Sequence, residues 1–317
     1  MGEFELIRRY FFPLADAGRH PDIVLGPGDD CAVQRLREGV DLVFSVDTLV
    51  EGVHFPQHYA PEKLAWRGLA VAASDLAAMG ADPVCFTLAI TLPEASPVWL
   101  QDFSTGLAAA SRQFGLSLAG GDTTRGPLTL TLQVHGTVPR GGEIRRSGAK
   151  PGDLICVSGT LGNAGAALEF LDEGSPTPAQ AELLSHYHAP QPGIALGQAL
   201  RGSASAAVDI SDGLAADLGH LLEESGVGGT INVDCLPISD TLIALRPDAI
   251  DLALYAGDDY QLCVTLPESS YEKLEGTVRD QLTAIGRITA GSGLSVEGAG
   301  QPGSERRRQG YDHFGSQ

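Results

Sequence analysis

Strand-like and helix-like apolar patterns alternate along this chain, and one segment poor in apolar residues interrupts them. The patterns of 41–47, 84–93 and 128–138 are typical of strands, and those of 61–81 and 96–114 are typical of helices. Pro61 opens the first of these helices and Gly80 closes it. The interruption is the Gly-, Pro- and charge-rich segment PRGGEIRRSGAKPGD, 139–153. This alternation predicts a mixed α/β (α+β) fold.

The alternation resumes after the interruption. Strands are predicted over 153–159, 206–210, 259–266 and 283–297, with helices near 163–172, 193–201 and 213–225. A chain of 317 residues also exceeds the size at which a single core stops growing, roughly 250 residues. We therefore expect an N-terminal domain over 1–138, a linker over 139–152 and a C-terminal α+β domain over 153–317.

The charge balance excludes some partners. Forty acidic and twenty-one basic side chains give a formal net charge of −19, which repels nucleic acid and anionic membranes. The N-terminal stretch has Glu3 and Glu5 and no apolar core of signal-peptide length, and about eighteen consecutive apolar residues occur nowhere. We expect a cytoplasmic protein with no nucleic-acid partner and no membrane association.

The cysteines do not indicate a covalent or metal framework. Five are present and widely spaced, so neither a disulfide scaffold nor a CxxC zinc site is favoured. Most have Val, Ile, Leu or Phe beside them, which predicts buried small apolar residues at Cys31, Cys85, Cys156, Cys235 and Cys263.

Aspartates recur in short polar stretches, most of which follow apolar runs or glycines. They are Asp29 and Asp30 in GPGDDCAV, Asp47 in SVDTLVEGVHF, Asp122 in GGDTTRG, Asp209 and Asp212 in DISDGL, and Asp258 and Asp259 in AGDDY. Each stretch alone is typical of a turn or a helix cap, and Ser211 or Asp212 would cap the helix that follows. Together they favour a divalent-cation site, because sites assemble at strand ends in α/β folds and Mg²⁺ prefers hard carboxylate oxygens.

One further aspartate lies inside a predicted helix. Asp75, in ASDLAAMGA, either lies on a solvated helix face or contacts a bound group.

The standard phosphate-binding motifs are absent. The chain has no GxxxxGK[ST], no GxGxxG between a strand and a helix, no kinase HRD or DFG, and no EF-hand spacing. The loop SGTLGNAGAAL (158–168) either cradles an anion at a helix N-terminus or allows close backbone packing. Phosphoryl transfer organised by carboxylate-bound Mg²⁺ is therefore the interpretation we favour.

Eight motifs in order resemble the thiamine-monophosphate kinase family across nearly the whole chain. They are GDDCAV, SVDTLVEGVHF, SDLAAMGADP, GGDTTRGPL, RSGAKPGD, DISDGL, GDDYQL and GYDHF. The resemblance implies ATP-dependent phosphorylation of thiamine monophosphate to thiamine diphosphate. It also implies the two-domain PurM-like fold of aminoimidazole ribonucleotide synthetase, in which N-terminal sheets pair across a homodimer.

The resemblance implies roles for individual residues. Several Mg²⁺ ions would be held by Asp30, Ser45, Asp47, Asp75, Asp122, Asp209 and Asp212, of which Asp47, Asp122 and Asp212 would be catalytic. The nucleotide would contact Gly121, Asp122, Arg146 and Ser211, and the thiamine substrate would contact His54, Asp258 and Tyr311. The residues alone allow other interpretations. Arg146 could equally be a solvated arginine of the linker, His54 a structural residue, and Tyr311 a residue that anchors the terminus.

The chain departs from the family pattern at two positions. Ala72 stands where the family has Asn, and Asp258 stands where it has Glu.

Two other functions stay open at this point. One is another ATP-using enzyme of the same fold, although the chain ends in HFGSQ without the C-terminal cysteine of a hydrogenase-maturation protein. The other is a non-catalytic acidic metal-binding scaffold. The absence of an obvious base motif fits the kinase, because a phosphate monoester with a second pKa of about 6 is already largely ionised at neutral pH.

Overall fold

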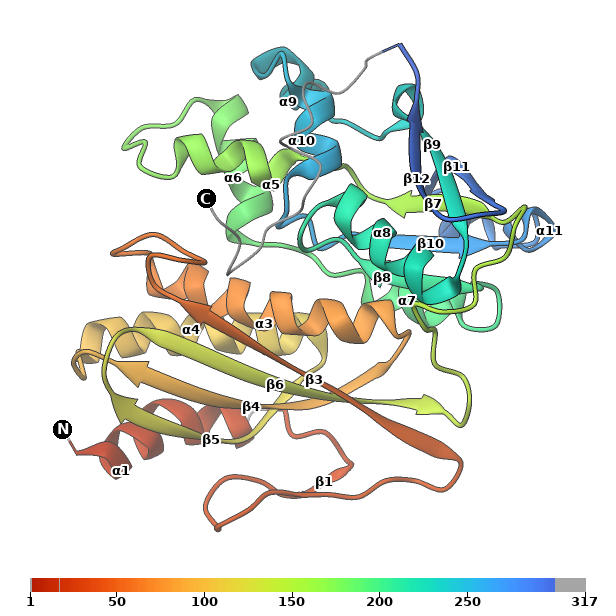
Figure 1. Ribbon diagram of the computed structural model, residues 1–317. Helices are drawn as coiled ribbons and strands as arrows, with labels where there is room; N and C mark the ends of the chain where they lie inside the picture. Colours follow the sequence, from red (N-terminus) through yellow and green to blue (C-terminus); the bar gives the residue numbers. More distant parts are fainter. Residues whose placement is uncertain (1, 17, 300–317) are drawn as a thin grey trace. The chain divides into compact units, whose positions relative to one another are not determined.

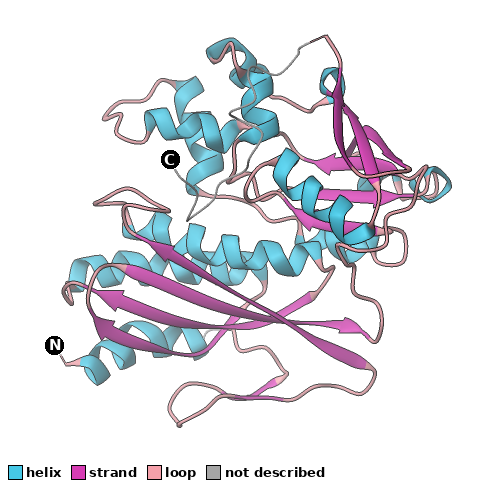
Figure 2. Cartoon of the chain, viewed as in Figure 1, coloured by secondary structure: helices cyan, strands magenta, loops and turns pink. Residues whose placement is uncertain are grey.

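The computed structural model describes residues 2–16 and 18–299 and has two compact units (Figures 1 and 2). Among the described residues, the first contains the chain up to Leu76 together with Ala81–Gly141, and the second contains Ala77–Gly80 and the chain from Gly142 to Ala299. No helix in the described part of the chain combines the length and the apolar character needed to cross a bilayer.

The first unit contains a four-stranded sheet. Its elements are α1 (Glu3–Leu6), η1 (Ile7–Phe11), α2 (Phe12–Asp16), β1 (Ile23–Leu25), β2 (Val33–Gln34), β3 (Val40–Val50), α3 (Pro61–Ala78), β4 (Asp82–Leu92), α4 (Pro97–Phe114), β5 (Ser117–Arg125) and β6 (Thr129–Pro139). The sheet order is β3-β6-β4-β5, with β4 and β5 parallel and the other pairs antiparallel. Strands β1 and β2 form a separate antiparallel pair.

Alternation along β6 decides which face of this sheet is covered. Leu130, Leu132 and Val134 are buried, and Gly68 of α3 lies directly against the first two. Helices α3 and α4 run along this face (Figure 1). The intervening residues of β6 point to the other face, as expected for a two-residue period. On β3 that other face carries Leu42, Phe44 and Val46, which are exposed.

The second unit contains a six-stranded sheet in the order β12-β9-β11-β7-β10-β8. Its elements are β7 (Leu154–Ser158), α5 (Asn163–Ala167), η2 (Leu168–Phe170), α6 (Pro178–His188), α7 (Ile194–Leu200), β8 (Ala206–Asp209), α8 (Leu214–Ser225), β9 (Gly228–Asn232), η3 (Val233–Cys235), α9 (Asp240–Leu245), α10 (Ala249–Tyr255), β10 (Leu262–Leu266), α11 (Glu268–Tyr271), α12 (Gly276–Arg279), β11 (Leu282–Thr289) and β12 (Gly293–Glu297).

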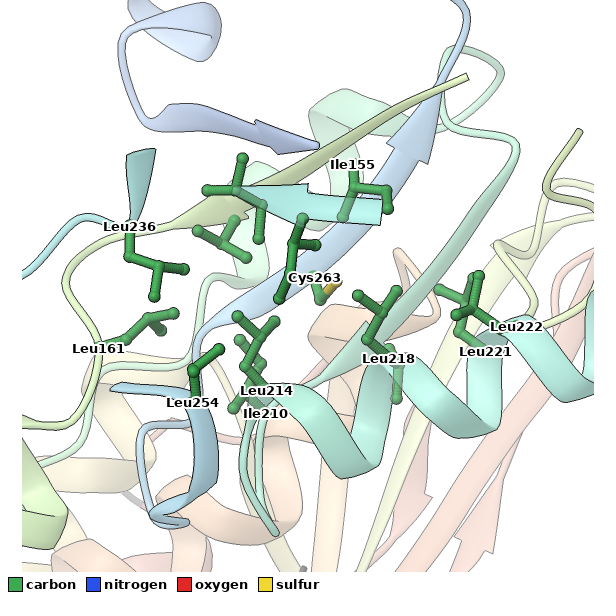
Figure 3. Packing of buried hydrophobic residues seen from close by; sticks show 14 of the residues in the cluster. Ile155, Leu161, Ile210, Leu214, Leu218, Leu221, Leu222, Leu236, Leu254 and Cys263 are labelled. Carbon is green, nitrogen blue, oxygen red and sulfur yellow. The ribbon is translucent and has the colours of Figure 1, made fainter. Parts of the chain in front are cut away.

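Both faces of this sheet are covered at its centre, where every residue of β7 is buried. Ile155 and Val157 belong to one apolar cluster with the leucines of α8 (Figure 3). Leu154 and Cys156 belong to a second cluster with Leu196 and Leu200 of α7. Adjacent residues of one strand therefore fill two cores, which explains why β7 is apolar from Leu154 to Val157.

The predicted elements are present, but several others were not predicted. Strand β5 was missed because its sequence SLAGGDTTR lacks apolar alternation, so the turn predicted at Asp122 is wrong. Close approach of β4 explains the glycine at position 121, since a Cβ there would lie 2.0 Å from the carbonyl oxygen of Leu88. Helix α6 is not predicted although it has a sequence signal: Thr177 and Gln180 form a capping box, with Pro178 at the first helical position.

The cysteine prediction is partly wrong. Cys85, Cys156 and Cys263 are buried as expected, but Cys31 and Cys235 are exposed, because they lie in a turn and in the short helix η3. All five are free thiols. Burial raises the pKa of the Cys85 and Cys156 thiols to about 12, which keeps them protonated and unreactive.

Candidate active site

The first unit brings two predicted metal ligands into direct contact. Ser45 lies in β3, and its hydroxyl donates a hydrogen bond to a carboxylate oxygen of Asp75 on α3. Asp47 lies two residues further along β3 and therefore points to the same face of the sheet. All three side chains are half-buried. Asp75 therefore contacts the sheet, and the alternative of a merely solvated helix face is wrong.

Asp122 lies at the far side of the same sheet. Asp47 pairs with Leu132 of β6, and the same row continues through Leu88 to Gly121 of β5. Three strand intervals of about 4.8 Å place β3 and β5 roughly 14 Å apart. Because Mg–oxygen bonds are only about 2.1 Å long, one ion cannot bind both Asp47 and Asp122 of the same chain. The sheet therefore separates these two predicted ligands.

Asp30 lies in an exposed turn between β1 and β2. Gly28 has a φ of 123°, a conformation that glycine adopts without strain. Asp29 accepts the backbone N–H of Asp30 through Oδ1 at 2.9 Å. The turn predicted from GPGDD is therefore confirmed, and its carboxylates lie at the surface.

His54 makes a local structural contact. Its ring Nδ1 accepts a hydrogen bond from the backbone N–H of Val50 at 3.0 Å, and the backbone N–H of His54 donates to the carbonyl oxygen of Val50. The first contact places the proton of the neutral ring on Nε2. The ring is thus held at the end of β3.

In the second unit, several predicted nucleotide and metal residues lie at the end of β8 and in the loop after it. Asp209 ends this strand and is buried, while Ser211 and Asp212 form the loop before α8. The predicted side-chain cap is wrong: Gly213 occupies the N-cap position and no side chain caps there. Instead, Asp217 of α8 reaches back, and its Oδ2 accepts the N–H groups of Ser211 at 2.9 Å and Asp212 at 3.0 Å.

Asp217 is not among the site residues that the sequence predicts. It is 4% exposed, and burial raises the pKa of its carboxyl to about 6, with Asp212 adding to the shift and backbone donors opposing it. Its position was detectable, because it lies three residues after Leu214 and four before Leu221, on the apolar side of the helix.

The predicted substrate residue Asp258 lies in a loop with unusual backbone angles. Asp258 has a φ of 71° and Tyr260 a φ of 48°, both in the left-handed region. The Tyr260 hydroxyl donates to Oδ1 of Asp258 at 3.0 Å, and the Asp258 N–H donates to the carbonyl oxygen of Ser211 at 2.9 Å. A Cβ at Gly257 would lie 2.3 Å from that same oxygen. Loops 256–260 and 210–213 are thus packed backbone to backbone.

Asp259 points the other way, into the protein. Its carboxyl accepts the N–H of Gly162 at 3.1 and 2.8 Å, and burial raises its pKa to about 8. A Cβ at Gly162 would lie 2.7 Å from the backbone nitrogen of Ala253, and one at Gly165 would lie 2.2 Å from Cβ of Ala256. Close packing therefore explains the glycines of loop 158–168.

Two predicted site residues and one departure from the family motif remain. The Arg146 side chain is exposed, and its carbonyl accepts the Ser225 hydroxyl at 3.0 Å. Ala72, one of the two departures from the family pattern, is fully buried in α3. Tyr311 lies outside the described residues.

The donor set suits a Mg²⁺ ion that is shared with substrate phosphates better than a metal ion bound by protein side chains alone. Within residues 2–16 and 18–299, no three His, Cys, Asp or Glu side chains are grouped to hold an ion. Mg²⁺ usually binds one or two carboxylates and completes its shell with water and substrate phosphates. The pair of Asp75 and Asp47 with the Ser45 hydroxyl fits that requirement.

Comparisons with known proteins agree on one family. The N-terminal and C-terminal domains of AIR synthase related protein match residues 28–138 and 150–299. The chain is 45% identical to the thiamine-monophosphate kinase of Salmonella typhimurium, over 99% of this chain and 98% of that one. The crystal structure of thiamine-monophosphate kinase from Stenotrophomonas maltophilia has a TM-score of 0.83 at 45% identity, covering 87% of this chain and 92% of the other. AaThiL complexed with AMPPCP and TMP has a TM-score of 0.79 at 31% identity, covering 88% and 89%. This chain belongs to the thiamine-monophosphate kinase family.

Proposed function

We propose that this chain transfers the γ-phosphoryl group of ATP to thiamine monophosphate, giving thiamine diphosphate and ADP. The observation that carries this function is the 45% identity to a thiamine-monophosphate kinase over nearly the full length of both chains. The AaThiL complex with AMPPCP, an ATP analogue, and TMP supports both substrates. A cytoplasmic location stays a prediction from the sequence.

The reaction needs positioning more than proton transfer. An oxygen of the substrate's phosphate forms a bond to the γ-phosphorus as the bond between that phosphorus and the β–γ bridging oxygen breaks, and ADP leaves. The attacking phosphate has a pKa of about 6 and is largely ionised at neutral pH. No residue therefore has to remove a proton, which fits a site built from carboxylates.

In the first unit, Mg²⁺ would be held at two separate positions. Asp75, Ser45 and Asp47 would supply oxygen ligands at one, with Asp30 from its exposed turn as a further ligand, and Asp122 would supply another about 14 Å away across the sheet. When bound, such ions supply positive charge that offsets the repulsion between the two phosphate-bearing substrates. The separation between β3 and β5 supports several ions rather than one.

In the second unit, Asp209 and Asp212 would bind metal, and Ser211 would contact the nucleotide. Arg146 is exposed, so its guanidinium can reach phosphate oxygens from solvent. Asp258 would bind the amino-bearing or cationic part of thiamine monophosphate. Its side chain is oriented by the Tyr260 hydroxyl, which suits a residue that must hold one geometry. His54, Gly121 and Tyr311 keep their proposed roles.

A homodimer through the first unit is also proposed. Strand β3 is an edge strand of eleven residues, and on its uncovered face Leu42, Phe44 and Val46 are 38%, 62% and 60% exposed. A row of apolar side chains on a long, exposed edge strand promotes aggregation unless another chain covers it. A second copy, related by twofold symmetry, would cover both rows at once.

The proposed function is tested by incubating the protein with ATP, Mg²⁺ and thiamine monophosphate and following thiamine diphosphate by chromatography. Formation of thiamine diphosphate with equimolar ADP is expected. Binding of Mg²⁺ and nucleotide without any product would instead identify an acidic metal-binding scaffold. Thiamine, which carries no phosphate, and phosphate monoesters other than thiamine monophosphate serve as control acceptors, and turnover with them alone would refute the substrate assignment.

A further inference from the structure

A buried carboxylate holds the loop that carries two candidate site residues. The loop 210–213 connects β8 to α8, and no side chain caps the helix that follows. Two of its N–H groups, those of Ser211 and Asp212, donate to the same Oδ2 of Asp217. Asp217 lies one turn into α8, where the leucines of that helix fix its position in the core (Figure 3).

The same loop is also tied on its other side. The Ser211 carbonyl accepts the N–H of Asp258, and the Ile210 carbonyl accepts the N–H of Tyr260 at 2.8 Å. Gly257 packs against the Ser211 carbonyl so closely that no side chain fits there. The backbone at Ser211 is therefore held from one side by Asp217 and from the other by the loop that carries Asp258.

We propose that Asp217 is a positioning residue for phosphoryl transfer, which fixes the backbone of Ser211 and Asp212 and, through the Ser211 carbonyl, the loop of Asp258. This inference rests on the proposed function of that site. It assigns to Asp217 no contact with substrate. Its action depends on the two hydrogen bonds that Oδ2 accepts.

The alternative is that Asp217 only stabilises the fold. Loss of a buried acceptor leaves two N–H groups unsatisfied, which destabilises a protein in either case. The two roles differ in their effect on kinetics below the melting temperature. A positioning residue changes kcat/KM, because a misplacement of about 1 Å can cost roughly 10²-fold in rate.

The chain offers a matched control in Asp153. This carboxylate is 5% exposed, and its Oδ2 also accepts two hydrogen bonds, from the Lys150 N–H at 3.0 Å and the Ser205 hydroxyl at 2.6 Å. It precedes β7 and lies beside the start of β8, at the opposite end of the strands from Asp209. Asp153→Leu removes comparable hydrogen bonds without touching loop 210–213.

The experiment compares wild type, Asp217→Asn, Asp217→Leu and Asp153→Leu. Leu has the shape of Asp but accepts nothing, so Asp217→Leu is expected to lower kcat/KM about 10²-fold and to raise KM for both ATP and thiamine monophosphate. Asn keeps a carbonyl oxygen that can accept both N–H groups, so Asp217→Asn should restore most of this loss. Asp153→Leu should lower Tm and leave kcat/KM within about threefold of wild type. Calorimetric binding of Mg²⁺ with AMPPCP should weaken in Asp217→Leu and not in Asp153→Leu.

Three results would overturn the inference. They are wild-type kinetics in folded Asp217→Leu, equal kinetic losses in Asp217→Leu and Asp153→Leu, and failure of Asp217→Asn to restore activity. If Asp217→Leu does not fold, Asp217→Ser takes its place, because its short side chain cannot reach both N–H groups. An inactive wild type would refute the proposed function instead, and the AMPPCP binding measurement would still decide the role of Asp217.

Discussion

Asp259 gives the protein a stability that depends on pH, and Asp259→Asn should remove that dependence. The carboxyl is 7% exposed, and burial raises its pKa from 3.8 to about 8. Between these values the unfolded chain releases the proton while the folded chain keeps it. Raising the pH therefore favours unfolding, so this contribution to stability is complete below pH 3.8 and is lost as the pH rises to about 8.

The size of the effect follows from the pKa difference. One pKa unit corresponds to about 1.4 kcal/mol, so about 4 kcal/mol of stability should be lost between pH 5 and pH 8. At about 2 to 4 °C per kcal/mol for a domain of this size, Tm of the second unit should fall by roughly 8 to 16 °C more in wild type than in Asp259→Asn. The asparagine keeps a carbonyl oxygen for the Gly162 N–H and carries no ionisable proton.

The assay is differential scanning calorimetry of both proteins from pH 5 to pH 8.5, at constant ionic strength and without nucleotide. The quantity compared is the difference in Tm between the two proteins at each pH, which cancels the contribution of the other acidic residues. Curves that stay parallel across this range would show that Asp259 is not held protonated in the folded protein, and the reasoning from burial would be refuted.

The remaining predictions concern the site and the dimer. Asp47→Asn or Asp122→Asn should lower kcat at least about 10²-fold with an unchanged circular dichroism spectrum, since each removes charge needed at a bound cation; full activity would remove that residue from the site. Asp258→Ala should raise KM for thiamine monophosphate roughly 10- to 150-fold and leave KM for ATP nearly unchanged, because a charge-assisted contact contributes about 1.5 to 3 kcal/mol. A lower Tm with an unchanged KM would show that Asp258 is only a turn residue. Phe44→Asp should convert the dimer to a monomer, measured by light scattering at micromolar concentration. The surface variant Val98→Asp serves as the control and should stay dimeric. A wild-type protein that is monomeric at this concentration would contradict the homodimer.

The sequence was informative where apolar periodicity or a specific motif was strong. The long helices α3 and α4 and the strands β3, β4 and β6 follow from their spacing. Strand β5 did not, because close approach to β4 demands glycine at position 121 and removes the alternation. The prediction of a helix cap at loop 210–213 is also wrong. Ser211 or Asp212 was expected to cap α8, but the carboxylate of Asp217, inside the helix, accepts the loop N–H groups instead.

The candidate residues were found by their motifs, but their arrangement was not predictable. Contact between Ser45 and Asp75 depends on how α3 packs on the sheet, and the separation of Asp47 from Asp122 depends on the strand order. Neither is encoded in local spacing. The burial of Asp217 was readable from helical periodicity, yet its partners were not, since they lie in the loop before the helix.

The contact between Gly257 and Ser211 limits how the substrate preference of such an enzyme can change. A loop whose backbone rests on another loop cannot be lengthened or shifted without displacing its neighbour. At position 258 the φ of 71° favours Asp, Asn or Gly, so only such replacements leave the backbone path unchanged. Under the proposed role of Asp258, directed evolution toward other phosphate acceptors should therefore tolerate Asn or Gly at this position and fail through insertions around it.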